Sequence, residues 1–171
     1  MASWAQAYGV DVVSDQLRVL TVRQPWAWAI IHGGKDVENR TRNIAGDYRG
    51  PVAIHAAREW DDALFVVPQH PALHEALVRA RQELPSYSAL QQLLDDQRGH
   101  VIGVVDLVDV HVRVPGDQYT KWCSPWAEPD HFHLVIENPR PLAKAVPARG
   151  FLSLWRPDEA LAAAIWEQVA A

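Results

Sequence analysis

TVRQPWAWAIIHGGKDVENRTR, residues 21–42, concentrates turn signals, two tryptophans and a compact group of charges in one stretch. Pro25 has a fixed φ that suits the first turn of a helix, and Gly33-Gly34 is typical of a helix end. We therefore expect a short helix over 26–32. The remainder of the chain is organised around this helix and the charged segment that follows it.

The charged segment carries Lys35, Glu38, Arg40 and Arg42. In extended backbone alternate residues share a face, so Glu38, Arg40 and Arg42 are expected to project together, with Lys35 at the turn before them. Taken singly, a helix tryptophan such as Trp26 is more often a core residue, and a Glu flanked by Arg is more often a surface ion pair. Their combination within a few residues is more specific and indicates a site.

Length and charge limit the classes of protein to which the chain can belong. At 171 residues with 49% apolar content, it is long enough for one domain with its own core. A net charge of −5 argues against a protein that coats nucleic acid, which would be strongly basic. Residues 17–58, however, carry seven basic side chains against three acidic ones. The sequence thus predicts a locally basic site on an acidic body.

Cys123 is the single cysteine, which excludes an intramolecular disulfide and a thiolate-rich zinc site. His131 and His133 share a face of an expected strand, but no third potential ligand lies at a sequence spacing typical of a metal site. Neither a metal nor another cofactor is therefore expected. No apolar run approaches ~20 residues, and the N-terminus lacks the pattern of a signal peptide. We expect a cytoplasmic protein without membrane contact.

The order of elements predicts an α+β fold, a small and partly open β-barrel of about six strands. The barrel is preceded by an arm at 1–16, and the domain proper is expected over 17–171. A helical insertion is expected at about 59–98, and a closing helix after Pro157. Besides the charged segment, strands are expected at 17–22, 52–57, 101–114, 131–138 (ended by Asn138-Pro139) and 148–155.

Further candidate site residues lie on these later strands and on the polar loop 115–130. His55, within the strand 52–57, is either a satisfied core histidine or faces the same cavity as the charged segment. Asp106 and Asp109 lie in an apolar strand, where at least one of them is expected to meet a cation or solvent, and Lys35 or Arg40 are candidates for that cation. Ser124 and Trp126 belong to the loop, whose composition is typical of a binding loop.

A family resemblance rests on several of these segments. The pattern GxKxxExR stands at Gly33, Lys35, Glu38 and Arg40, preceded by RQPWAWAII. Matching segments follow as YRGPVAIHAA, GVVDLVD, SPW, FHLVIENPRPL and ARGFLSLW. Over about residues 17–156 the chain resembles the ASCH domain, a branch of the PUA-like superfamily.

The resemblance implies a PUA-like barrel whose mouth holds a component of nucleic acid. Relatives in the superfamily bind RNA or read modified bases, and some ASCH proteins are reported as ribonucleases. A bacterial ASCH group hydrolyses N4-acetylcytidine with a Lys, a Thr three residues later and a Glu from a later strand. Lys35 matches that Lys, Glu38 stands in place of the Thr, and the strand 101–114 offers Asp106 and Asp109 instead of a Glu.

Three hypotheses follow. The first is a module that binds single-stranded RNA or a modified nucleobase in a cleft at the barrel mouth. The second is a small hydrolase, of N4-acylcytidine or RNA, with Lys35 and Glu38 as the catalytic pair. The third is a domain that binds a protein partner through 59–98. The expected ligand-binding residues are Trp26, Lys35, Glu38, Arg40, Arg42, His55, Asp106, Ser124 and Trp126.

Overall fold

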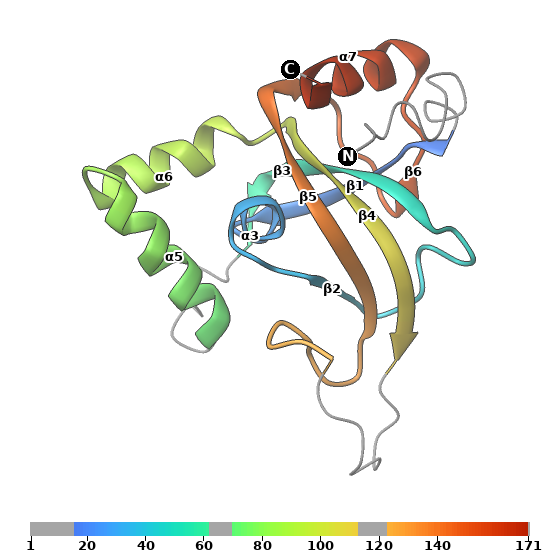
Figure 1. Ribbon diagram of the computed structural model, residues 1–171, viewed down its shortest axis with the longest axis horizontal. Coiled ribbons are helices and arrows are strands. Elements are labelled where there is room, and N and C mark those ends of the chain that lie inside the picture. Colours follow the sequence, from blue (N-terminus) through green and yellow to red (C-terminus); the bar gives the residue numbers. More distant parts are fainter. Residues whose placement is uncertain (1–15, 62–69, 113–122, 171) are drawn as a thin grey trace.

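A mixed sheet of six strands forms the framework of the computed structural model, which describes residues 16–61, 70–112 and 123–170 (Figure 1). Residues 1–15 of the expected arm lie outside these ranges. The strands are β1 (Arg18–Gln24), β2 (Val37–Arg40), β3 (Gly50–Trp60), β4 (His100–Val112), β5 (Phe132–Pro147) and β6 (Leu154–Trp155). The helices in the described ranges are α3 (Trp26–His32), α5 (Pro71–Glu83), α6 (Tyr87–Asp96) and α7 (Glu159–Ala170).

The strand order β2-β5-β4-β3-β1-β6 leaves the sheet open, as a half-barrel. Strands β1 and β3 are parallel, because the chain crosses over through α3 and β2 before it returns, and the other pairings are antiparallel. The ladder between β4 and β5 is interrupted by register shifts, and bulges of this kind bend and twist a sheet. The expected α+β half-barrel with about six strands is confirmed.

Helix α3 fills the concave side of the half-barrel (Figure 1). Ala27, Ile30 and Ile31 on one side pack against the sheet, while Trp28 and Ala29 on the other side pack against the α5–α6 pair. A helix that is apolar on all sides is stable only when it is buried. The short helix expected over 26–32 is confirmed, and it forms the centre of the molecule.

The ends of α3 follow the local signals. The amide of Gly33 donates to the carbonyl of Ala29 at 2.9 Å, and Gly34 has φ +76°, a left-handed value that favours glycine. At the other end, Gln24 accepts a hydrogen bond from the Trp28 amide at 3.0 Å through Oε1. Its amide Nε2 donates to Gln97 Oε1 at 3.0 Å. The fully buried Gln24 thus connects α3 to the end of α6.

The opposite face of the sheet is covered by α7, which lies across the ends of β4 and β5 (Figure 1). Neighbouring residues of one strand point to opposite faces. Val104 accordingly packs under Ala162 and Ile165 of α7, whereas Val105 packs under α3. The two helices therefore bury both faces of the sheet, and the closing helix expected after Pro157 is confirmed.

Two strand limits expected from the sequence are wrong. Strand β5 continues past Asn138-Pro139 to Pro147, because Asn138 adopts a left-handed φ of +51° in a bulge. Beyond residue 135 the outer side of β5 has no strand partner among the described residues, and proline is tolerated at a sheet edge. The expected strand 148–155 is reduced to Leu154–Trp155, since Ser153 has φ +65°, which breaks extended backbone.

Within the expected helical insertion, the described residues 70–98 contain α5 and α6, which pack against each other beside the barrel (Figure 1). Residues 62–69 of the insertion lie outside the described ranges. The side chain of Ser86 accepts from the amide of Ala89 at 3.1 Å and caps α6. Among the described residues, no helix combines the length and apolar character needed to cross a bilayer.

Candidate functional site

A cleft of about 690 Å³ opens at the mouth of the half-barrel. Its walls come from β1, the start of α3, β2, the end of β3, the segment before β5 and the segment 151–152. Trp26, Lys35, Glu38 and Arg40, which the sequence suggests for one site, all line it. The fold brings them together because α3 turns back at Gly33-Gly34 and delivers β2 to the barrel edge.

A chain of three charges lies at the base of the cleft. Nζ of Lys35 is 3.4 Å from Oε2 of Glu38, and the Arg40 guanidinium is 3.1 Å from Oε1 of the same carboxylate. Arg40 also donates to the carbonyl of Thr21 at 3.2 Å, and Lys35 donates to the carbonyl of Val37. Glu38 and Arg40 share a face of β2 as expected, whereas Lys35 reaches Glu38 from the preceding turn.

Burial affects the acid–base behaviour of Lys35. Desolvation lowers the pKa of its ammonium from 10.5, and the negative charge of Glu38 opposes that shift. Burial penalises the charged form of a lysine, while a nearby carboxylate favours it. The two effects oppose each other, so the affinity of Lys35 for its proton inside the protein depends on Glu38.

Aromatic rings surround Lys35. Its Nζ lies 5.5 Å from the ring centroid of Trp26 and 5.8 Å from that of Trp126, both within range of a cation–π attraction. The imidazole of His70 stacks on Trp126 at 5.4 Å and meets the edge of Trp26 at 5.0 Å. Burial lowers the pKa of His70, and Lys35 adds to that effect. His70 thus lies between two indoles, and its surroundings favour the neutral imidazole.

Several candidate residues lie elsewhere. Trp126 is buried behind Lys35 and does not line the cleft. Ser124 is buried too, where its hydroxyl donates to the Asp36 carboxylate and accepts from the Trp126 amide at 3.0 Å. Arg42 is exposed beyond the end of β2, so it does not share the face of Glu38 and Arg40 as the sequence led us to expect.

Asp106 has a different partner from the one expected. Neither Lys35 nor Arg40 pairs with it. Instead Arg140 of β5 binds its two oxygens at 2.6 and 3.1 Å, and Asn138 donates to it at 3.0 Å. The bulge at Asn138 brings this part of β5 beside Asp106 on β4. Asp106 is absent from the lining of the cleft.

Sequence reasoning missed residues on the wall formed by the segment before β5. Asn39 donates to the carbonyl of Trp126 at 2.8 Å and accepts from the amide of Glu128 at 3.1 Å. This holds Glu128 and His131 at the cleft. The only local signal was the position of Asn39 between Glu38 and Arg40. Phe151 and Leu152 close the opposite side of the cleft. They were missed because the sequence assigned them to the expected strand 148–155.

A second, basic pocket of about 1010 Å³ adjoins the cleft, and the two share Thr21 and Phe151 among their lining residues. Arg58, Arg98 and Arg149 line it, against a single carboxylate among the lining residues. His55 lies here rather than in the cleft. Its Nε2 is 3.2 Å from the carbonyl of Ala148, and burial lowers the pKa of its imidazole.

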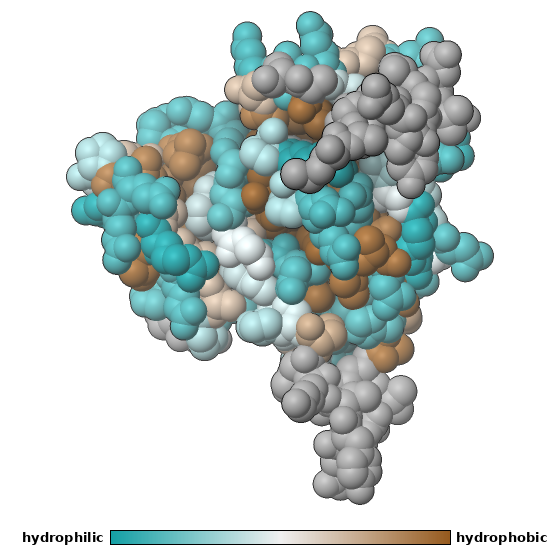
Figure 2. Space-filling model, in the orientation of Figure 1, coloured by the Kyte–Doolittle hydropathy of each residue, from teal (hydrophilic) through white to brown (hydrophobic). Residues whose placement is uncertain are grey.

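The helical insertion, to which the third hypothesis assigns a protein partner, carries a further hollow of about 540 Å³ between α5 and α6. Its lining is mostly apolar and includes Leu77, Leu90 and Leu94. On the face shown in Figure 2, hydrophobic residues on this helix pair are interspersed with hydrophilic ones.

The half-barrel, the buried helix across its mouth and the Lys–Glu–Arg chain beneath that helix define a PUA-like domain. The model of the ASCH domain family matches residues 20–145. Since this is well over half of the chain, the protein belongs to the ASCH domain family. The matched range runs from β1 into the second half of β5 and so includes Lys35, Glu38 and Arg40. A comparison with curated proteins gives no match.

Proposed function

We propose that the protein binds single-stranded nucleic acid, RNA in the first place, and holds one base or modified base in the cleft. The observation that carries this proposal is the Lys35–Glu38–Arg40 chain beside the indole of Trp26 in one cavity. A cavity of about 690 Å³ falls within the usual range of small-molecule sites, about 300–1,000 Å³.

Unused hydrogen-bonding capacity supports a base as the ligand. Each oxygen of Glu38 accepts from one cation, and a carboxylate has about four acceptor positions in all. Nε of Arg40 is buried and has no hydrogen-bond partner among the described residues. A base that carries an exocyclic amine and hydrogen-bond acceptors on one edge, as cytosine does, would donate to Glu38 and accept from Arg40 or Lys35.

The cleft and the adjoining basic pocket differ in the charge of their lining residues, and this difference suits them to different parts of a nucleotide. The cleft is lined by nearly equal numbers of cations and carboxylates, since Glu59, Asp61 and Glu128 accompany Glu38. This balance suits an uncharged base better than a phosphate. The adjoining pocket, with Arg58, Arg98 and Arg149, suits the phosphate of a neighbouring nucleotide. A single strand would thus place a base in the cleft and its backbone across the basic pocket.

Fluorescence titration with nucleosides and short oligonucleotides tests the proposal, because eight tryptophans supply the signal. We expect the nucleosides to bind weakly, and oligonucleotides to bind more tightly with a steep salt dependence. Trp26→Ala should lower the affinity for both by about 5- to 150-fold, the equivalent of ~1–3 kcal/mol of stacking. Trp26→Phe should retain most of it.

Arginine variants separate the two pockets. Arg149→Ala should reduce only oligonucleotide affinity and its salt dependence, because nucleosides carry no phosphate. Arg79→Ala, which removes an exposed arginine from α5, is the matched control and should change neither. If Trp26→Ala and Glu38→Gln both leave nucleoside and oligonucleotide affinity at the wild-type value, the proposed function is wrong.

A hydrolase is the second candidate, favoured by the lowered pKa of Lys35. A lysine whose pKa is depressed can act as a general base or nucleophile. For an N4-acylated cytidine, water would add to the acyl carbon, the bond to the exocyclic nitrogen would break, and that nitrogen would take up the proton. Turnover of N4-acetylcytidine or of labelled RNA that is lost in both Lys35→Met and Glu38→Gln would support this activity. Turnover that persists in both variants would exclude this site.

A further inference from the structure

Two histidines face each other across the β4–β5 ladder, and neither of them lines the cleft or the basic pocket. His111 near the end of β4 and His133 near the start of β5 are paired in register. Directly opposite residues of an antiparallel pair project on the same face with neighbouring Cβ atoms. The two imidazole centroids are accordingly 5.3 Å apart.

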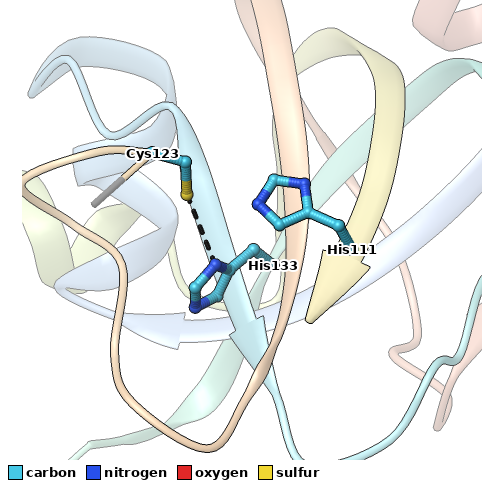
Figure 3. A group of neighbouring side chains, drawn as sticks. All are labelled: His111, Cys123 and His133. Atoms are coloured by element: carbon cyan, nitrogen blue, oxygen red, sulfur yellow. Dashed lines mark hydrogen bonds between the residues drawn. The ribbon is translucent and has the colours of Figure 1, made fainter. Parts of the chain in front are cut away.

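Cys123 joins this pair from the segment that precedes β5. Its sulfur lies 3.3 Å from Nδ1 of His133, and the potential ligand atoms of the three residues all lie within 4.8 Å of one another. Figure 3 shows the sulfur, the His133 ring and the His111 ring turned toward a common centre. The sequence placed His131 beside His133 on one strand face, but the structure places His111 and Cys123 next to His133 instead.

Each imidazole is oriented by a hydrogen bond on its far side. His133 donates through Nε2 to the carbonyl of Glu128 at 2.8 Å, which leaves Nδ1 with a lone pair that faces Cys123. His111 uses Nδ1 for the carboxylate of Asp109 at 2.8 Å, which leaves the lone pair on Nε2. In protein metal sites the ligating histidine characteristically donates its other ring N–H to a carboxylate or a backbone carbonyl. Both histidines meet that condition.

We propose that His111, Cys123 and His133 form a metal site for Zn²⁺ or a similar divalent ion that prefers nitrogen and sulfur ligands. A tetrahedral zinc with bonds of about 2.0–2.3 Å keeps its ligand atoms roughly 3.3–3.6 Å apart. The Cys123–His133 separation of 3.3 Å already has this size, and a modest inward movement of the partly exposed His111 completes the triangle. Binding releases the Cys123 proton to solvent, and the thiolate becomes a ligand.

Charge around the site favours a cation. The carboxylate of Asp109 lies 2.8 Å from Nδ1 of His111, and the carboxylate of Asp36 accepts a hydrogen bond from Ser124, the residue after Cys123. Their negative charges attract a divalent ion. Three protein ligands leave a fourth position for water, and the exposure of Cys123 keeps that side open.

The site has a structural connection to the cleft. Cys123 begins the segment that carries Trp126 behind Lys35 and Glu128 at the cleft wall. The carbonyl of Glu128 is also the acceptor of His133. A bound ion would therefore fix both ends of this wall to the sheet, one through Cys123 and the other through His133.

The test uses the full chain, stripped with a chelator and then titrated with Zn²⁺. Because Cys123 is the only cysteine, its rate of reaction with a disulfide reagent reports on the site alone. We expect one equivalent of Zn²⁺ to slow that reaction by about tenfold or more. Co²⁺ in its place should give the charge-transfer band of a cobalt–thiolate bond.

Variants decide whether the three residues act together. Cys123→Ser should abolish the cobalt–thiolate band, and His111→Ala should lower Zn²⁺ affinity by at least about tenfold. Asp109→Asn, which removes only the orienting carboxylate, should lower it about 10- to 100-fold. His74→Ala, an exposed histidine of α5, is the matched control. The proposal is overturned if Zn²⁺ does not protect Cys123, or if His111→Ala binds as tightly as His74→Ala.

Discussion

The Lys35 ammonium and the Glu38 carboxylate lie 3.4 Å apart, with only 3% and 9% of their side chains exposed. Removing two charges from water costs several kcal/mol for each ion, and pairing repays that cost only in part. A buried ion pair is therefore weak support for stability. Its position at the base of an open cleft, with Arg40 on the second carboxylate oxygen, favours a role in ligand binding.

Glu38→Ala should destabilise the protein strongly. Removing one partner of a buried pair leaves the other charge uncompensated, which costs about 3–5 kcal/mol. Glu59→Ala is the control, because its ion pair with Arg23 is largely exposed and should contribute about 1 kcal/mol or less. Urea unfolding measures both free energies. Equal losses in the two variants would show that the burial of Glu38 has no energetic consequence.

Stability should respond to pH through Lys35. Burial lowers its pKa below 10.5 in the folded protein, whereas the unfolded chain keeps the ordinary value. Between these two values the unfolded chain binds more protons, so the contribution of Lys35 to the free energy of unfolding rises with pH across that window. The difference in unfolding free energy between wild type and Lys35→Met should shift in favour of wild type from neutral pH to about pH 10. A constant difference would contradict this.

Gly34→Ala tests the turn that delivers Lys35 to the cleft. Gly34 has φ +76° and a Cβ there would meet no atom within 4 Å, so the cost is purely conformational. A left-handed backbone costs an alanine roughly 1–2 kcal/mol. Gly34→Asn should cost less, since Asn tolerates this region better. Urea midpoints of the two variants give the comparison. An Ala variant as stable as wild type would show that the left-handed backbone at position 34 carries no such cost.

Asp106→Asn should leave ligand affinity unchanged. Asp106 binds Arg140 in a bidentate pair outside the cleft, with both side chains more than one quarter exposed. We expect a loss of stability of about 1 kcal/mol or less, measured by urea unfolding. Oligonucleotide titration checks the affinity. A clear loss of affinity, in a variant that remains folded, would extend the binding site to this part of β4.

Local signals predicted the centre of the fold well. The helix 26–32 begins after Pro25 and ends at Gly33-Gly34. Proline restricts its own φ, and glycine adopts backbone angles that other residues avoid, so both signals act locally. The prediction that the strand ends at Asn138-Pro139 was wrong, because these residues form a bulge inside β5 instead of a turn. A residue pair that ends a strand in one context is accommodated in another when the outer edge of that strand is free.

The candidate site was predicted in part for a related reason. Trp26, Lys35, Glu38 and Arg40 lie close in the chain, and one helix end and one short strand are enough to bring them together. Asp106 was paired with the wrong cations, since its partner Arg140 depends on the register between β4 and β5. His70 was missed because nothing near it in the chain indicates that it lies between two indoles.

The sequence by itself determined the short helix, the charged strand after it and the resemblance to the ASCH domain. These features depend on residues a few positions apart, where backbone preference and side-chain period act directly. Only the tertiary structure decided that Trp126 lies behind Lys35, that His55 opens on a separate basic pocket, and that Cys123 meets His111 and His133. Those contacts join distant segments, and strand register and the path of the chain between strands determine which side chains meet.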